Sequence, residues 1–146
     1  SLSIPIRRDY DKVNVLNGKK LFRDMKCNSC HKESFTTSNN YPANPTLQNI
    51  TIRPFSDFLL HNMGDELADN RTDYLANGNE WRTQPLWGLG MIQEVNKHNF
   101  LLHDGRARNI EEAILWHSGE AENSKNKYKK LTKEERTNVL DFLNSL

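Results

Sequence analysis

The stretch MKCNSCHKES, residues 25–34, contains both cysteines of the 146-residue chain and one of its five histidines. Cys27 and Cys30 stand three positions apart, and His31 follows directly. The pattern C-x-x-C-H allows three interpretations: a redox-active dithiol, half of a zinc site, or an attachment site for haem. The surrounding sequence favours one of the three.

A redox-active dithiol is expected inside a βαβ unit, and the flanking sequence predicts none. A zinc site needs two more ligands, but only His98 and His103 have the spacing H-x₃₋₅-H, and they lie on either side of an apolar strip. Haem attachment needs no further cysteine, because two thiols at this spacing reach both vinyl groups of one porphyrin edge. The motif therefore predicts a c-type cytochrome with one covalent haem c, bound through Cys27 and Cys30, and with His31 as proximal iron ligand.

The composition fits a buried prosthetic group. Apolar residues make up 36% of the chain, and the mean hydropathy is -0.82. Soluble domains ordinarily contain ~45–50% apolar residues, on a count that includes Gly and omits Tyr. A flat macrocycle at the centre would supply the apolar mass that the side chains lack.

The charges exclude some classes of partner. The chain has 20 basic and 19 acidic residues and a formal net charge of +1, which offers no field for nucleic acid or an anionic membrane. The basic run of Lys125, Lys127, Lys129 and Lys130 is interpreted as a solvated helix end or loop. No apolar stretch approaches the ~18–20 residues of a transmembrane helix, so we expect no membrane span.

Apolar periodicity predicts a first helix over residues 12–26 and a second over residues 55–63. In the second, Phe55, Leu59 and Met63 recur four residues apart, and a glycine follows as a stop signal.

A third helix is predicted to begin at Asn109 and a last one at Thr132, where Glu135 completes a capping box. Segments 32–54 and 64–102 are predicted to be mostly loop, and no segment alternates with a period of two residues. One face of the third helix carries Ile110, Ala113, Ile114 and His117.

These elements predict a single domain, residues 1–146, of the mostly α class. We expect a cytochrome c-like domain in which helices and long loops wrap around one covalent haem. The first and last helices would cross over one edge of the porphyrin.

Several blocks of sequence beyond the C-x-x-C-H motif resemble a known family. They are NPTLQ (44–48), RPFSDFLLHNMG (53–64), EWRTQPLWGLG (80–90), LHDGRAR (102–108) and EEAILWH (111–117). Together they resemble the C-terminal haem domain of the di-haem thiol-oxidoreductase-like proteins, often called di-haem peroxidases. These proteins are distant relatives of the bacterial di-haem cytochrome c peroxidases.

The resemblance implies a redox role and a periplasmic or otherwise extracytoplasmic location. The family carries two C-x-x-C-H motifs, whereas this chain has one, so peroxidase activity does not simply carry over. The chain begins with Ser1 rather than Met. We therefore expect a processed chain, or a domain excised from a larger di-haem protein.

The resemblance also suggests roles for single residues, each beside a simpler alternative. Arg82 resembles a basic residue that meets the haem propionates, and is otherwise a surface arginine. Trp87 is expected to line the porphyrin, unless it belongs to the core. His103 matches a residue near the haem that is not an iron ligand, and is otherwise a hydrogen-bonded turn histidine. His61 is expected to be exposed.

His117 is the predicted distal iron ligand, which would give a bis-histidine iron. It lies on the apolar face of the third helix, and the distant di-haem enzymes place their distal ligand, commonly Met, fourteen residues after the histidine of L-H-D-G. The alternative distal ligand is Met63, whose thioether is also expected to face an apolar stripe.

The expected function is electron transfer to or from a redox partner protein or a second haem domain. The alternative is the electron-entry domain of a peroxidase-like di-haem oxidoreductase. A haem-based sensor is a third class, and it would need an open iron site. Coordination discriminates among them, because two strong protein ligands favour electron transfer.

Overall fold

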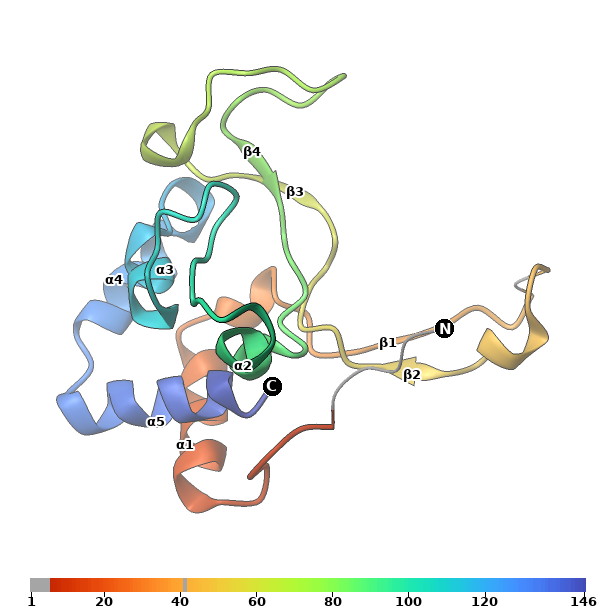
Figure 1. Cartoon of the computed structure of the whole chain (residues 1–146), viewed down its shortest axis with the longest axis horizontal. Coiled ribbons are helices and arrows are strands. Elements are labelled where there is room, and N and C mark those ends of the chain that lie inside the picture. Colours follow the sequence, from red (N-terminus) through yellow and green to blue (C-terminus); the bar gives the residue numbers. More distant parts are fainter. Residues whose placement is uncertain (1–5, 41) are drawn as a thin grey trace.

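The first and last helices pack against each other and form the centre of the core (Figure 1). They are α1 (Val13–Asp24) and α5 (Lys133–Asn144) in a computed structural model that describes residues 6–40 and 42–146. The aromatic ring of Phe142 on α5 lies 5.3 Å from Phe22 on α1 and 5.8 Å from Phe55, between ring centroids. The core cluster consists of Val15, Phe22, Met25, Phe55, Tyr128, Val139, Phe142, Leu143 and Leu146.

Gly18 permits the close approach of these two helices. A Cβ atom at this position would lie 1.9 Å from the backbone oxygen of Asn138 on α5. Glycine in a helix interior is destabilising by roughly 0.5–1 kcal/mol relative to alanine, and here the tight packing offsets that effect. The predicted helix over residues 12–26 is confirmed by α1.

The other predicted helix starts are confirmed at two of three positions. The side-chain oxygen of Asn109 accepts a hydrogen bond from the Glu112 backbone N–H (2.8 Å) at the start of α3 (Ile110–Trp116). Thr132 and Glu135 form the expected capping box of α5. Two further helices, α2 (Ile92–Asn96) and α4 (Glu122–Lys129), lie where none was predicted, and α4 contains most of the basic run.

The predicted second helix, residues 55–63, is wrong. Phe55 and Phe58 have φ angles of 52° and 61°, in the left-handed region that a helix excludes. The Ser56 hydroxyl accepts from the Phe58 N–H (2.9 Å), and a carboxylate oxygen of Asp57 accepts from the Leu59 N–H (3.0 Å). Such short-range bonds from side chain to backbone compete with helix formation.

The mostly α fold class is also wrong. Helical residues make up 42% of the structure and strand residues 10%, so the chain is not an all-helical cytochrome c domain. The strands form two small antiparallel sheets. One joins β1 (Phe35–Thr36) to β2 (Thr51–Ile52), and the other joins β3 (Leu60–Asn62) to β4 (Glu80–Arg82). Strands of two or three residues are too short to show a period of two in the sequence, which is why they were not predicted.

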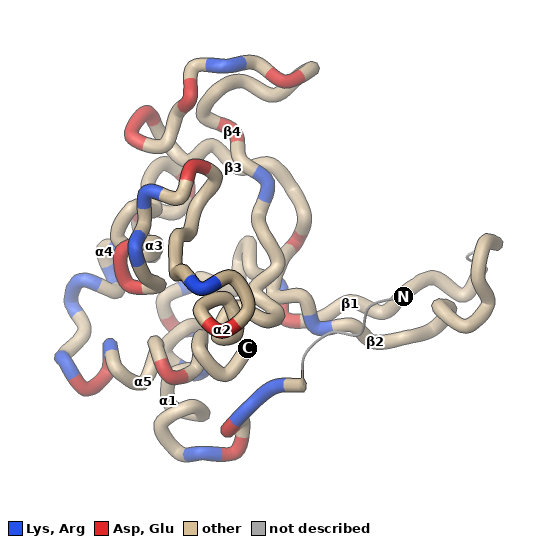
Figure 2. The backbone as a smooth tube through the Cα atoms, viewed as in Figure 1, with Lys and Arg blue, Asp and Glu red and all other residues tan. Residues whose placement is uncertain are grey.

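The two sheets lie in different parts of the molecule. The β1–β2 pair extends away from the helices as an arm, and the β3–β4 ribbon lies next to the 3₁₀ turn (Gly119–Ala121) that leads into α4 (Figure 1). Figure 2 shows that acidic and basic residues are interspersed along most of the chain. Residues 35–52, which include the arm, contain no acidic or basic residue. Within the described residues, no helix is both long and apolar enough to cross a membrane.

Candidate functional site

The C-x-x-C-H segment turns sharply away from the end of α1. Lys26 has a φ angle of 70°, and a single turn of 3₁₀ helix (Cys27–Ser29) follows. Met25, which is 3% exposed, anchors the start of this turn in the core. Both cysteines are half-buried free thiols, so the sequence presents two thiols and His31 next to the core.

The two thiols lie in surroundings that keep them protonated. Burial raises the pKa of Cys27 to about 11. Burial, together with the nearby carboxylates of Asp57 and Glu120, also raises the pKa of Cys30. A redox-active dithiol needs a lowered thiol pKa, so the structure disfavours that interpretation of the motif.

The His31 ring has a fixed orientation. Its Nδ1 lies 2.8 Å from the carbonyl oxygen of Phe55, and its centroid lies 6.3 Å from that of Phe22. Burial lowers the pKa of His31 to about 4, so the imidazole is neutral near pH 7. A neutral ring that donates from Nδ1 keeps a lone pair on Nε2, which is the state that binds a metal.

The ring of His117, at the end of α3, is oriented by a backbone carbonyl in the same way as the ring of His31. It is the C-cap residue of α3, and its Nδ1 lies 2.6 Å from the carbonyl oxygen of Ala113 in that helix. Burial lowers the pKa of His117 as well. Its Nε2 therefore also keeps a lone pair.

The two histidine rings lie next to each other. Their centroids are 6.4 Å apart and their planes are inclined by 45°. Two imidazoles that hold one metal between them, each at about 2.0–2.1 Å, have centroids roughly 6 Å apart. Both rings are only half-buried. The donor set of two neutral imidazoles beside two thiols therefore fits an iron porphyrin.

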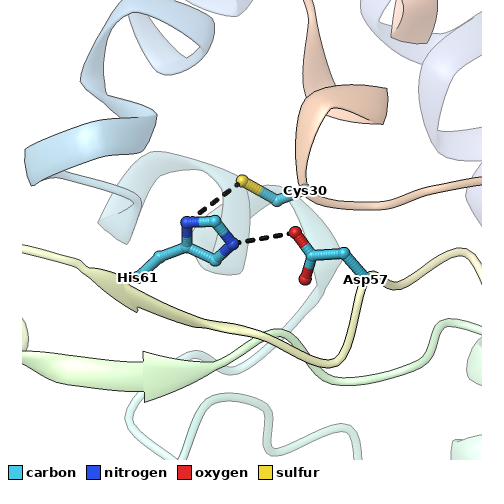
Figure 3. A group of neighbouring side chains, drawn as sticks. All are labelled: Cys30, Asp57 and His61. Atoms are coloured by element: carbon cyan, nitrogen blue, oxygen red, sulfur yellow. Dashed lines mark hydrogen bonds and ion pairs between the residues drawn. The ribbon is translucent and has the colours of Figure 1, made fainter. Parts of the chain in front are cut away.

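A second cluster surrounds the Cys30 thiol (Figure 3). The Sγ atom of Cys30 lies 3.7 Å from Nδ1 of His61, and Nε2 of His61 lies 2.9 Å from a carboxylate oxygen of Asp57. Glu120 approaches the same Nδ1 to 2.9 Å. The ligand atoms of Cys30, Asp57 and His61 all lie within 4.8 Å of one another.

His61 is held by its neighbours rather than exposed to solvent. It lies on β3 opposite Trp81 of β4, and its side chain is 17% exposed, so the expectation of an exposed residue is wrong. Burial lowers the pKa of His61, but the hydrogen bonds to Glu120 and Asp57 outweigh burial, and the net shift is upward. The two carboxylates therefore stabilise the protonated ring. Sequence reasoning missed Asp57 and Glu120, because no short spacing links them to Cys30.

The other predicted residues are placed by different contacts. Arg82 is exposed on β4 opposite Leu60. Trp87 is half-buried. His103 stacks on Trp81, with ring centroids 3.6 Å apart and planes inclined by 12°.

Met63, the alternative distal ligand, is half-buried directly after β3. Its backbone N–H donates to the carbonyl oxygen of Asn79 (2.8 Å). The hydrogen bonds described for Met63 are thus made by its backbone, whereas those of His31 and His117 orient their rings.

One pocket of about 540 Å³ is lined mainly by α3 and the residues just before it, and its lining includes no histidine. Its two arginines are already paired, Arg106 with Asp104 (2.7 Å) and Arg108 with Glu112 (2.9 Å). The pocket is lined by Glu66, Arg106, Arg108, Glu112, Leu115 and Trp116. Because both arginines already have carboxylate partners, the pocket offers no free basic group that would mark it as a ligand site.

Comparison with known proteins identifies a family for this chain. The sequence model of a family described as "Di-haem oxidoreductase, putative peroxidase" matches residues 1–146, the whole chain. No curated protein and no solved structure matches it.

Proposed function

The chain belongs to the di-haem oxidoreductase family, and we propose that it acts as a c-type cytochrome that transfers single electrons. Cys27 and Cys30 would attach one haem c, and His31 and His117 would hold its iron. The bound haem would supply the one-electron redox chemistry.

The observation that carries this proposal is the pairing of His31 with His117. The 6.4 Å between their ring centroids suits two ligands of one iron. The carbonyl groups of Phe55 and Ala113 orient the rings and favour the tautomer with a free Nε2. Two such ligands would leave the iron no open position for a substrate, which favours electron transfer over peroxide chemistry or gas sensing.

A second haem is part of the proposal. The family name implies two haems, whereas these 146 residues contain two cysteines and a single C-x-x-C-H. We propose that the second haem belongs to a redox partner protein or to another haem domain, and that both lie in the periplasm or another extracytoplasmic compartment. The alternative function, electron entry into a peroxidase-like di-haem oxidoreductase, rests on the same family membership.

Substitution of the distal ligand tests the proposal. The wild-type mass should exceed the polypeptide mass by one haem even after denaturation. His117→Ala should allow cyanide or carbon monoxide to bind the iron, because it removes one ligand. Met63→Ala is the matched control and should leave the optical spectrum unchanged. The reverse outcome, with an open site only in Met63→Ala, would make Met63 the ligand.

A peroxide assay separates the two functions. With a reduced electron donor, the isolated chain should turn over hydrogen peroxide poorly, since two histidines would hold the iron and leave no site for peroxide. Turnover comparable with that of a complete di-haem peroxidase would instead place an open iron site in this chain.

A further inference from the structure

The proposed electron transfer makes no use of the arrangement of Cys30, His61 and Asp57. The Cys30 sulfur lies 3.7 Å from Nδ1 of His61, and Asp57 holds the other nitrogen at 2.9 Å (Figure 3). A thiol beside a histidine that is oriented by a carboxylate is the arrangement that enzymes use to activate a sulfur nucleophile.

Cys27 provides the comparison within the same motif. Among the residues that the structure describes, the Cys27 thiol has no histidine or carboxylate as a hydrogen-bond partner, and the one cluster of possible ligand atoms contains Cys30 alone of the two cysteines. The two thiols would react with the two vinyl groups of one haem, so they perform the same chemistry with different neighbours.

We propose that His61 is the proton donor for formation of the thioether bond at Cys30. This inference rests on the proposed function, since it requires a covalent haem. As the Cys30 sulfur bonds one vinyl carbon, the S–H bond and the carbon–carbon π bond break. Nδ1 of His61 gives a proton to the other vinyl carbon, and the thiol proton replaces it. The net reaction adds S–H across the double bond and consumes no oxidant or reductant.

The neighbours of His61 suit this role. Nδ1 of His61 lies 3.7 Å from the sulfur, where it can take up the thiol proton as the new bond forms. Asp57 is a positioning residue, because its carboxylate holds Nε2 and thereby turns Nδ1 towards Cys30. Glu120, 2.9 Å from Nδ1 and 55% exposed, can pass protons between the ring and solvent.

The test measures haem attachment at each cysteine separately. Haem-free chain, kept reduced, is mixed anaerobically with ferrous haem, and samples are denatured at intervals. Free thiols are alkylated and located by fragmentation mass spectrometry, so the readout is the thioether bond and not the activity of the loaded protein. The variants are His61→Gln, Asp57→Asn and, as a matched control, His98→Gln, which changes an exposed histidine.

We expect attachment at Cys30 to slow on the order of 100-fold in His61→Gln, the usual contribution of a positioned acid or base. Asp57→Asn should slow it roughly 10-fold, as loss of an orienting partner does. Attachment at Cys27 should keep its wild-type rate in both variants, and His98→Gln should match the wild type at both cysteines.

Three outcomes would overturn the inference. One is wild-type attachment at Cys30 in His61→Gln. Another is an equal fall at both cysteines in both variants, which would make the cluster merely structural. A wild-type chain that attaches haem at neither cysteine would overturn the proposed function and this inference with it, and is distinguishable from the other two.

Discussion

The α1–α5 pair and the segment from Phe55 to His103 are stabilised in different ways. In the helix pair, apolar side chains are removed from water, and Phe142 is fully buried. In the segment, several large apolar side chains remain in contact with water, including Leu59 at 61% and Phe100 at 58% exposure. Its turns depend on hydrogen bonds of polar side chains such as Ser56 and Asp57.

This difference assigns separate tasks to the two regions. A fully buried Phe or Leu contributes about 1.5–3 kcal/mol, so the helix pair can hold the end of α1, and with it the C-x-x-C-H turn, in place. The segment instead brings polar groups to the site: the Phe55 carbonyl for His31, and the Asp57 carboxylate for His61. One region supports the site, and the other shapes its chemistry.

The largest stability effect should come from the helix pair. Leu143→Ala on α5, where the side chain is 4% exposed, should lower the free energy of unfolding by about 2–5 kcal/mol, because it leaves a cavity. The matched control is Leu16→Ala on α1, where the side chain is 51% exposed and the change should be within about 0.5 kcal/mol. Urea titration measures both. Equal effects would mean that the α1–α5 contact is not the core.

A smaller effect is expected from the polar turn of the segment. The Ser56 hydroxyl is buried, donates to the Thr83 carbonyl (2.7 Å) and accepts from the Phe58 N–H. Ser56→Ala leaves both partners unsatisfied and should reduce the free energy of unfolding by about 1–3 kcal/mol. Thr36→Ala in the exposed β1 strand is the control. No loss in Ser56→Ala would show that packing, not hydrogen bonding, fixes this turn.

The smallest effect concerns the pH dependence of stability at His61. Because the pKa of His61 is raised in the folded chain, its ion pairs stabilise the fold below the unfolded pKa of about 6.5. That contribution is lost as the pH rises through the folded pKa. Solvent screens the half-exposed Glu120, so we expect about 1 kcal/mol or less.

The measurement compares unfolding of the wild type and His61→Gln from pH 5.5 to 8.5. The wild type should lose more stability than the variant over this range. The lowered pKa values of His31 and His117 act in the opposite direction, but both proteins retain these residues. If the stabilities of the two proteins changed in parallel with pH, the ion pairs of His61 would not stabilise the fold.

Sequence patterns predicted what depends on near neighbours in the chain. The caps at Asn109 and Thr132 lie within four residues of their partners, and α1, α3 and α5 were found on such signals. The turn at Ser56 depends on near and distant partners together. Its hydroxyl accepts from the Phe58 N–H and donates to Thr83, 27 residues away, and no local pattern reveals the second bond. His61 was misjudged for the same reason, since Glu120 lies 59 residues along the chain.

One regular spacing in the sequence led to a wrong helix prediction. Phe55, Leu59 and Met63 have helical spacing, yet Phe55 is buried in the core while Leu59 faces solvent. Spacing alone could not reveal that the backbone takes left-handed φ angles there. His117 was chosen from its helix face and a family resemblance, and that prediction still needs a direct test.

The optical and electron-spin resonance spectra of the oxidised protein test the central claim most directly. We predict a six-coordinate, low-spin ferric haem with two imidazole ligands, His31 and His117, a relatively low reduction potential and no iron–thioether charge-transfer band. An iron–thioether band would show that methionine, with Met63 as the candidate, is the distal ligand. A high-spin spectrum would show an open iron site and contradict the electron-transfer proposal.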